Sequence, residues 1–216
     1  MYYTNQITFL FLNFRSLRAH LLDVLSDKTL LEADVICLQE TWSLRSDPVP
    51  SIPGYKCYLA GEGKGKGVAI FIKSHFVEGK KHLRVNSLGN KDNLQGLKLY
   101  FEDLHILNIY RPPNHTSIAD VEDFMNIMKQ NIDPHKQTLV CGDFNINFLK
   151  EPRHKISTLL KDLGFQQIVR HPTTIYGSCL DHVYLRTNVL HRCRLHYPYY
   201  SDHECVCIML KKQIHK

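Results

Sequence analysis

Polar residues that can serve metal or phosphate chemistry follow several apolar runs of this 216-residue chain. Residues 138–141 form one short, mostly apolar run, Gly142 breaks it, and Asp143 and Asn145 come directly after it. Alone, these residues are typical of an Asp/Asn turn at a strand end. The same feature recurs at three other runs, which end at Asn13, Glu40 and Tyr110. Because sites in α/β proteins gather where the carboxyl ends of strands line up, we expect one shared site.

Two Asp-His dipeptides add imidazoles to this set. Asp181 and His182 lie within a predicted strand, where neighbours point to opposite faces, so only one of them can face the site. Asp202 and His203 precede the last predicted strand, where the chain is not yet regular, so both can contribute. A histidine that works as a charged group usually needs a carboxylate on its other nitrogen, and Asp181 is the candidate partner of His203. The alternative is that each dipeptide is solvated surface.

Hydrophobic periodicity predicts the elements that position these residues. Strands are expected at residues 6–14, 33–38, 55–59, 68–73, 94–101, 104–109, 136–141, 173–177, 180–185 and 204–210, and helices at 17–31, 118–132 and 156–163. Two hairpins are predicted, one turning at Glu102-Asp103 and the other at Gly177-Ser178. The last strand is apolar on both faces, which predicts burial between layers. We find no internal repeat or linker and expect a single domain over residues 1–216.

The glycine-rich stretch at residues 61–67 is not a nucleotide-binding P-loop, because Val68 stands where the Ser or Thr hydroxyl would be needed. It predicts a hairpin turn, with Lys64 and Lys66 available for phosphate contacts. A turn with no further role is the alternative.

Composition bounds the class of protein. With 44% hydrophobic and 22% charged residues, the chain can bury a sizeable core. A formal charge of +6 suits a polyanionic partner such as nucleic acid, although many ordinary enzymes share it. The seven cysteines include no CxxC pair, which predicts a reducing, intracellular compartment without a disulfide framework. Residues 1–6 lack the basic region of a signal peptide, and no run is long enough to span a membrane.

Six motifs, in order, carry a resemblance. They are Asn13, Gln39-Glu40-Thr41, Tyr110-Arg-Pro-Pro-Asn114, Gly142-Asp-Phe-Asn145, Leu180-Asp-His182 and Ser201-Asp-His203. Together they resemble the endonuclease/exonuclease/phosphatase superfamily, and most nearly the endonuclease domains of mobile elements, namely non-LTR retrotransposons and some rolling-circle transposons. These domains are similar to abasic-site endonucleases. The motifs cover nearly the whole chain.

This resemblance implies an α/β fold, a four-layered sandwich of two packed β-sheets flanked by helices, of the DNase I-like kind. It also implies hydrolysis that depends on Mg²⁺, with Mn²⁺ as an alternative. Glu40, Asn13 and Asp202 would serve the metal, Asp143 would orient or deprotonate the attacking water, and Asn145 would hold that water or a phosphate oxygen. His203, paired to Asp181, would stabilise the phosphate transition state, and Tyr110 would contact the phosphate or leaving oxygen. Substrate would be bound by Arg111, Asn114, Lys64 and Lys66.

One departure narrows the activity. Abasic-site endonucleases carry an acidic residue two positions after the motif asparagine, where this chain has Arg15. The segment Arg15-Ser-Leu17 instead resembles the mobile-element nucleases. The Trp-Cys-Asp-Arg signature of inositol-polyphosphate 5-phosphatases and the His-Leu-x-Ser segment of other branches are absent from the sequence.

The predicted function is therefore a Mg²⁺-dependent DNA endonuclease that nicks one strand and leaves a 3′ hydroxyl. We expect a monomeric, nuclear protein whose parent element also encodes a reverse transcriptase or helicase. Two alternatives remain open: a domesticated nucleic-acid-binding module without turnover, and a phosphatase or ribonuclease of the same superfamily.

Overall fold

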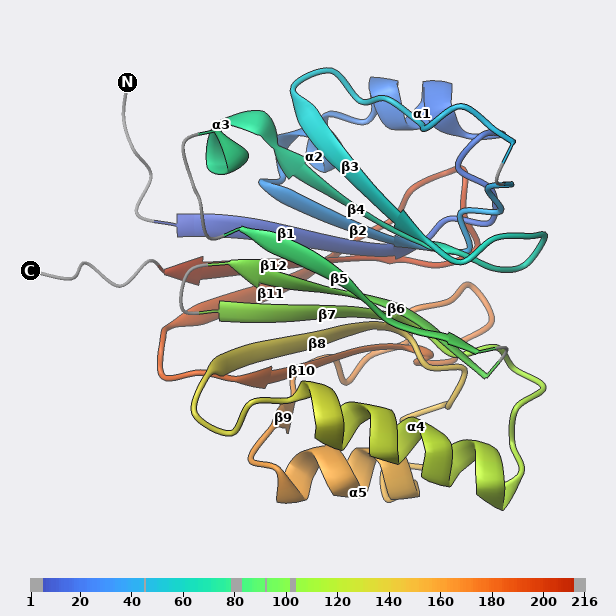
Figure 1. Cartoon of the computed structure of the whole chain (residues 1–216), viewed down its shortest axis with the longest axis vertical. Helices are drawn as coiled ribbons and strands as arrows, with labels where there is room; N and C mark the ends of the chain where they lie inside the picture. Colours follow the sequence, from blue (N-terminus) through green and yellow to red (C-terminus); the bar gives the residue numbers. More distant parts are fainter. Residues whose placement is uncertain (1–5, 45, 79–82, 92, 102–103, 212–216) are drawn as a thin grey trace, which may run out of the picture.

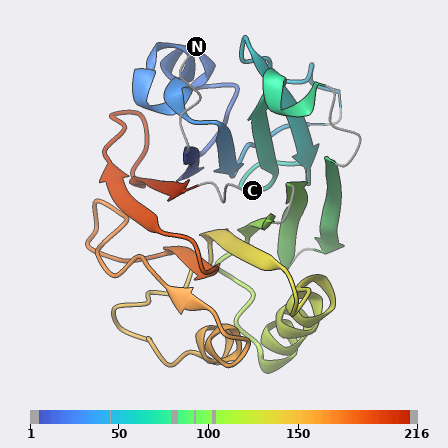
Figure 2. The ribbon, with the colours of Figure 1, turned by 90° about the vertical axis from the view of Figure 1, so that its left-hand side faces the viewer.

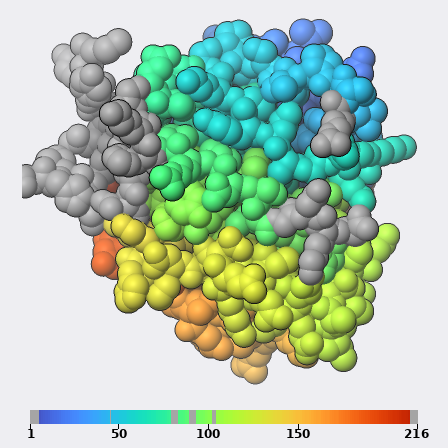
Figure 3. All heavy atoms as spheres, in the orientation of Figure 1, coloured from blue at the N-terminus to red at the C-terminus, as the bar shows by residue number. Residues whose placement is uncertain are grey.

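Two six-stranded β-sheets pack face to face, and helices cover the outer face of each (Figure 1). The computed structural model describes residues 6–44, 46–78, 83–91, 93–101 and 104–211. Viewed from the side, helices lie at both extremes with the two sheets between them (Figure 2). In the space-filling view, the cyan and yellow segments are both packed against the green strands between them (Figure 3). The predicted four-layered α/β sandwich is confirmed.

The first sheet is built around a parallel pair of strands. Its order is β11 (His191–His196), β12 (Cys205–Lys211), β1 (Gln6–Asn13), β2 (Val35–Gln39), β4 (Val68–Lys73) and β3 (Tyr55–Ala60). Only β1 and β2 run parallel, and the other neighbours are antiparallel. The crossover between them carries α1 (Leu21–Ser26) and α2 (Lys28–Glu32), and a short helix, α3 (Ser74–Val77), follows β4.

The second sheet repeats this arrangement. Its order is β5 (Arg84–Lys91), β6 (Leu94–Phe101), β7 (Leu104–Tyr110), β8 (Gln137–Asp143), β10 (Asp181–Arg186) and β9 (Gln166–Gln167). The parallel pair is β7 and β8, joined by α4 (Ile118–Asn131), and α5 (Lys155–Asp162) lies beside α4. Asn13 pairs with Gln39, and Tyr110 pairs with Asp143, so both strands of each parallel pair have polar residues at their carboxyl ends.

Alternation along the strands divides the apolar residues between layers. On β1, Phe9 and Phe11 enter the core between the two sheets, whereas Leu10 and Leu12 pack beneath α1 and α2. A third cluster joins α4 and α5 to the outer face of the second sheet, with Phe124 among its buried residues. Because successive side chains of a strand point to opposite faces, strands buried on both sides must be apolar throughout, and β12 is of this kind, as predicted.

The two central strands of the second sheet approach closely at Gly142. Its φ is +131°, and a Cβ atom there would lie 1.8 Å from the carbonyl oxygen of Ile109 on β7. Only glycine fits this position, which comes immediately before Asp143. The glycine that breaks the apolar run is therefore what lets β8 reach the site.

The single helix predicted at residues 17–31 is wrong, since the structure has two short helices there. Asp27 separates them in an extended conformation, with its Oδ1 accepting a hydrogen bond from the backbone N–H of Leu30 at 3.1 Å. Its Oδ2 accepts another from the Tyr200 hydroxyl at 2.7 Å. An aspartate that caps the next turn competes with helix continuation, and the periodicity of the leucines does not reveal this.

The hairpin predicted between residues 173–177 and 180–185 is also wrong. The backbone N–H groups of Thr173 and Thr174 both donate to the Ser178 carbonyl, which closes a compact loop instead of a strand. β10 begins at Asp181 and pairs with β8 and β9. Periodicity also missed α3, β5, β9 and β11. The hairpin of β6 and β7 is confirmed by their pairing, whereas its predicted turn at Glu102-Asp103 lies outside the described residues, as do residues 1–5.

Within the described ranges, no helix is both long enough and apolar enough to cross a membrane. All seven cysteines are free thiols.

Candidate active site

Asn13 ties the two sheets together at the carboxyl ends of their central strands. Its side chain is fully buried, and Nδ2 donates to Glu40 Oε1 at 2.9 Å and to Asp143 Oδ2 at 2.8 Å. The Tyr110 hydroxyl donates to the same Glu40 oxygen at 3.2 Å. One amide thus holds a carboxylate from each sheet, and the four strand ends singled out in the sequence meet at one place.

The backbone at these strand ends adopts conformations that are rare for residues other than glycine. Left-handed φ values occur at Arg15, Ser16, Glu40, Trp42 and Asn145. All of them lie in the segments that directly follow β1, β2 and β8. Such conformations cost energy and persist only where surrounding contacts enforce them, so they concentrate at functional sites. Here the hydrogen bond from the Ser16 N–H to the Glu40 carbonyl, at 2.8 Å, joins two of the segments.

Asp143 is buried and accepts hydrogen bonds on both oxygens. The backbone N–H of Asn145 donates to its Oδ1 at 2.9 Å, and the Asn145 amide donates to its Oδ2 at 3.2 Å. Burial raises the pKa of Asp143 above its ordinary value, and the nearby charge of Asp181 raises it further, against the opposing effects of His203 and of the hydrogen bonds from the Asn145 N–H and the Asn13 amide. This carboxylate therefore binds a proton more readily than an exposed aspartate does.

His203 and Asp181 form the predicted pair. His203 Nδ1 lies 2.8 Å from Asp181 Oδ2, and both side chains are buried. Thr173 fixes the carboxylate further by donating from its hydroxyl to the same oxygen at 2.7 Å. Burial alone would lower the pKa of His203, but the charge and hydrogen bond of Asp181 outweigh it and raise the pKa to about 9. The imidazole is therefore protonated at neutral pH.

The loop that replaces the predicted hairpin is what brings this pair together across the two sheets. The Glu204 N–H donates to the Thr173 carbonyl at 2.7 Å, and Thr174 forms an isolated bridge with His203. On the other side, the Ser201 hydroxyl donates to the Asn13 carbonyl at 2.9 Å and accepts from the His203 N–H at 3.0 Å. His203 is thus anchored through its backbone to both halves of the sandwich before β12 begins.

Asp202 faces Arg15, the residue that departs from the abasic-site pattern. Arg15 Nη1 lies 2.8 Å from Asp202 Oδ2, and the arginine side chain remains 55% exposed. The other oxygen, Asp202 Oδ1, is buried with no hydrogen-bond partner among the described residues. One oxygen of this carboxylate is therefore neutralised by a cation, and the other is left for a further ligand.

The oxygen donors at this site fit a hard divalent cation of the Mg²⁺ type. The described residues contain no ready-made group of three or more His, Cys, Asp or Glu side chains placed to hold a metal. Mg²⁺, however, is usually held through one or two carboxylates, with water and substrate phosphate completing its shell. Glu40 supplies such a carboxylate. The Asn13 Oδ1 atom accepts only a long hydrogen bond, 3.3 Å, from the Arg15 N–H, so it can also serve as a ligand. Asp202 has one oxygen without a hydrogen-bond partner among the described residues.

The expected contact of Arg111 with substrate is not supported. Its side chain is buried, and the guanidinium donates to the carbonyls of Phe144 and His115. Its backbone N–H donates to the Asp143 carbonyl at 2.9 Å, and its carbonyl accepts from the Asn145 amide. Arg111 therefore holds the loops after β7 and β8 in place. The sequence shows an arginine beside a tyrosine but not where the arginine side chain points. Asn114 is exposed on the same loop, and its contact with substrate stays a prediction.

The two lysines of the glycine-rich loop lie next to Trp42. The Lys64 ammonium is 5.8 Å from the centre of the indole ring, and the Lys66 carbonyl accepts a hydrogen bond from the Trp42 backbone. The indole Nε1 in turn donates to Glu40 Oε2 at 3.1 Å. The loop is thus attached to the site edge through Trp42, while the phosphate contacts of both lysines remain a prediction.

Sequence reasoning missed the positioning residues Trp42, Thr173 and Ser201. Trp42 and Ser201 could have been suspected, because one follows and the other belongs to a recognised motif, but Thr173 carries no signal of its own. Of the Asp181-His182 dipeptide, Asp181 faces the site. His182 stacks on Phe144 with ring centres 4.8 Å apart, and burial lowers its pKa to about 4. It therefore serves the packing of the second sheet.

Comparisons with known proteins agree with this geometry. Residues 11–203 match the model of the Endonuclease/Exonuclease/phosphatase family. The chain is 29% identical over 171 residues to Recombination repair protein 1 of Drosophila melanogaster, covering 65% of this chain and only 24% of that protein.

Solved structures share the fold at low sequence identity. The AP endonuclease LMAP of Leishmania major superposes with a TM-score of 0.72 at 16% identity, over 96% of this chain and 88% of that one. The endonuclease domain of TRAS1, a telomere-specific non-LTR retrotransposon, gives 0.69 at 16% identity, over 97% and 100%. At such identities the likeness establishes the fold alone. With the family match spanning all six motifs, the chain belongs to the Endonuclease/Exonuclease/phosphatase family.

Proposed function

We propose that this protein is a divalent-metal-dependent endonuclease that hydrolyses one strand of DNA and leaves a 3′ hydroxyl. The observation that carries the proposal is the buried network in which Asn13 joins Glu40 to Asp143, beside the Asp181–His203 pair. Relatives of known structure include proteins solved with DNA, such as the 3′ phosphatase NExo of Neisseria bound to a product DNA hairpin. The basic charge of the chain, +6, suits the same substrate.

Each group has a role that follows from its environment. Asp143, whose pKa is raised by burial, is suited to orient a water molecule and accept its proton, with the Asn145 amide beside it. His203, protonated and held by Asp181, donates a charged hydrogen bond to the phosphate as negative charge develops there. A divalent ion bound by Glu40 and Asn13 would supply Lewis acidity at the phosphate. Tyr110, a neutral phenol beside Glu40, is placed to contact a phosphate or leaving oxygen.

We further propose a mobile-element type of nuclease, acting in the nucleus. Its support is Arg15, which pairs with Asp202 where abasic-site endonucleases place an acidic residue. A cation there cannot replace a carboxylate at the metal, and it adds a positive charge where a DNA phosphate would approach.

The direct test is incubation of supercoiled plasmid with the purified protein and Mg²⁺, followed by gel separation and mapping of the cut ends. Open circles whose nicks can be extended by a polymerase are expected, since extension requires a 3′ hydroxyl. Folded protein that binds DNA without nicking it across several salt and metal conditions would favour the binding-module alternative. Release of inorganic phosphate without strand scission would favour a phosphatase, and cleavage confined to RNA would favour a ribonuclease.

Replacing Glu40 by glutamine should raise the Mg²⁺ concentration needed for half-maximal nicking more than it weakens DNA binding. The amide keeps an oxygen ligand but removes the negative charge that favours the cation. A metal titration of nicking, with DNA binding measured separately, gives both quantities. Glu122→Gln, the same change on the exposed side of α4, is the control. An unchanged half-saturating concentration would show that Glu40 is not the principal ligand.

Replacing Asp181 by asparagine should move the alkaline limb of the pH–rate profile to lower pH. In the wild type, the pKa of His203 is raised to about 9, so its protonated form persists well above neutrality. Asparagine keeps the shape but removes the charge that favours protonation, so the proton is lost earlier as pH rises. Rates measured from about pH 5.5 to 9.5, with Asp162→Asn as control, test this. An unmoved limb with undiminished rate would break the proposed pair, whereas a lower rate without the shift would mean that His203 works as a neutral donor.

The Asp181–His203 pair should also affect the stability of the folded protein, which can be measured without an activity assay. His203 binds its proton more tightly in the folded protein than in the unfolded chain, where the pKa is about 6.5. Its contribution to stability is therefore complete below about pH 6.5 and is lost as pH rises towards 9. Asp181→Asn should flatten this decline in urea unfolding measured at several pH values.

A further inference from the structure

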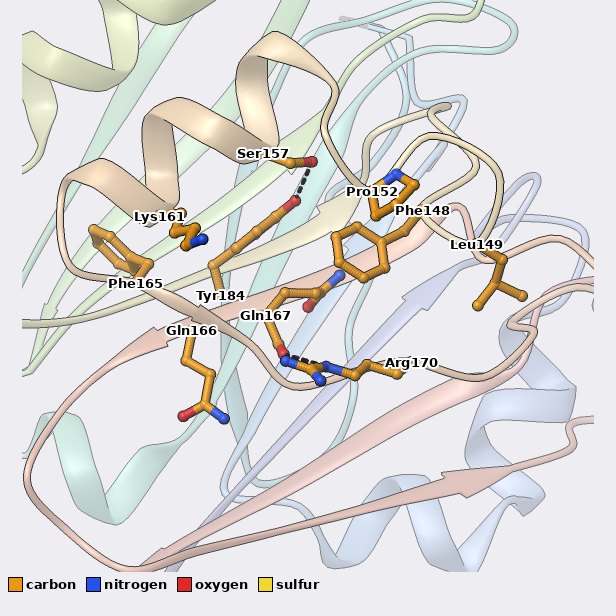
Figure 4. Close-up of a pocket in the computed structure, with 10 residues that line it drawn as sticks. All are labelled: Phe148, Leu149, Pro152, Ser157, Lys161, Phe165, Gln166, Gln167, Arg170 and Tyr184. Carbon is orange, nitrogen blue, oxygen red and sulfur yellow. Dashed lines mark hydrogen bonds between the residues drawn. The ribbon is translucent and has the colours of Figure 1, made fainter.

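A cavity lies away from the candidate active site, between α5, β9, β10 and the loop after β8 (Figure 4). Its volume is about 560 Å³, within the range of small-molecule sites. Phe148 and Leu149, which line one side, belong to the loop that begins at Asp143 and Asn145. None of the catalytic candidates lines this cavity.

The cavity contains a fixed hydrogen-bond donor without a partner. Gln167 is 6% exposed, and its Oε1 accepts from the backbone N–H groups of Val183 at 3.1 Å and Val169 at 3.3 Å. Because both of these partners are donors, the amide cannot flip, and Nε2 must point the other way. Figure 4 shows it directed towards Phe148, which lines the cavity. Among the described residues Nε2 has no hydrogen-bond partner. A buried donor of this kind favours a ligand that brings an acceptor.

The rim of the cavity is positively charged. Lys161 on α5 and Arg170 after β9 both line it, both are exposed, and no carboxylate is among its lining residues. The Arg170 Nε–H donates to the Gln167 carbonyl at 3.4 Å, which keeps the guanidinium next to the buried amide. Two cations on one rim, with no acidic group between them, favour a ligand that carries a negative charge.

The walls are aromatic. Phe148 and Phe165 line the cavity with Tyr184 between them, and the Arg186 guanidinium lies over one face of Phe165, 4.7 Å from the ring centre. The Tyr184 hydroxyl is held 2.8 Å from Ser157, so its ring is fixed in the wall. Aromatic side chains stack on planar heterocycles such as nucleobases, with little dependence on which base is present.

We propose that this cavity binds a nucleotide, with the base against Phe148 and the phosphate between Lys161 and Arg170. A ligand with a planar ring, carbonyl or ring-nitrogen acceptors and one phosphate satisfies the aromatic wall, the Gln167 donor and the rim at once. Inorganic phosphate would use only the rim, and an uncharged nucleoside only the interior. The nucleotide can be free or part of a nucleic acid strand, since both present the same groups.

Calorimetric titration with deoxyadenosine 5′-monophosphate, deoxyadenosine, inorganic phosphate and a short single-stranded oligonucleotide tests this, with EDTA present to keep metal from the catalytic site. The monophosphate should bind at least about tenfold more tightly than deoxyadenosine or phosphate. Comparing it with the oligonucleotide distinguishes the two sources. Tighter binding of the oligonucleotide marks a subsite for a nucleic acid strand, and equal binding marks a site for the free nucleotide.

Variants assign the binding to this cavity. Lys161→Glu and Arg170→Glu should each weaken it about tenfold or more, because each reverses an exposed rim charge. Gln167→Glu keeps the acceptor for Val169 and Val183 but replaces the donor, and should weaken binding similarly. Lys155→Glu, the same reversal elsewhere on α5, should leave it unchanged. The proposal is overturned if the wild type does not distinguish the monophosphate from phosphate or deoxyadenosine. It is equally overturned if the rim variants bind like Lys155→Glu. Neither outcome depends on nuclease activity.

Discussion

Replacing Asp143 or His203 by alanine is expected to lower the rate of plasmid nicking by about 10²-fold or more, because in the proposed mechanism each removes a group that lowers the barrier to hydrolysis. Asp143 is held by Asn13 and Asn145, and His203 is held by Asp181. We therefore expect no neighbouring side chain to take over the role of either residue. Initial rates at saturating Mg²⁺ measure the loss. Retention of more than about a tenth of wild-type activity would remove that residue from the catalytic set.

Misfolding must be separated from lost chemistry in this experiment. Alanine at position 143 leaves the donors of Asn13 and Asn145 without their acceptor, which can itself destabilise the protein. Asp143→Asn keeps the volume and one oxygen and serves as the second variant. Both should still bind DNA and keep the wild-type circular dichroism spectrum. Asp162→Asn, an exposed change at the end of α5, should retain full activity.

Replacing Gly142 by alanine is expected to lower the free energy of unfolding by roughly 3 kcal/mol or more, since steric overlap and left-handed strain act together. The new Cβ would lie 1.8 Å from the Ile109 carbonyl oxygen, so β7 and β8 would have to separate. Urea unfolding measures the effect. Gly54→Ala is the matched control, because φ there is +82° but no atom lies within 4 Å of the added Cβ.

The control should cost about 1–2 kcal/mol, the strain of a left-handed φ alone. The difference between the two variants then isolates the contact between the strands. Equal destabilisation would mean that β7 and β8 separate easily at this point. Because Asp143 follows directly, Gly142→Ala should also lower the nicking rate of the protein molecules that remain folded.

The fold was predicted from the resemblance carried by the six motifs, and the positions of its central strands from local apolar patterns. A strand buried on both faces appears in the sequence as a continuous apolar run, and β1, β2, β8 and β12 were all located this way. The polar residues at their ends were recognised because a catalytic group interrupts an apolar run at the sheet edge. The contact between Asn13, Glu40 and Asp143 follows once those strands are central and parallel in pairs.

The sequence does not show where a side chain points, or which of several possible hydrogen-bond partners it takes. Whether Arg111 points to solvent or into the loops depends on tertiary carbonyls that no local pattern encodes. Asp27 ends one helix and begins another because Tyr200, far along the chain, also binds it. Thr173 and Thr174 have the composition of a strand, yet they close a loop around Ser178. For Arg111 and Asp27, a hydrogen bond to a residue distant in the sequence overrides the local preference, whereas the loop at Thr173 is closed by the nearby Ser178.

The pairing of the first and last strands has a practical consequence. Gln6 at the start of β1 lies opposite Lys211 at the end of β12, whereas Asn13 and His203 lie at the other ends of these strands. The first residue of β1 and the last residue of β12 therefore lie side by side, at the strand ends remote from the candidate active site. A short linker between these two strand ends should yield a circular permutant that still folds, and a protein fused at either strand end should leave the candidate active site uncovered.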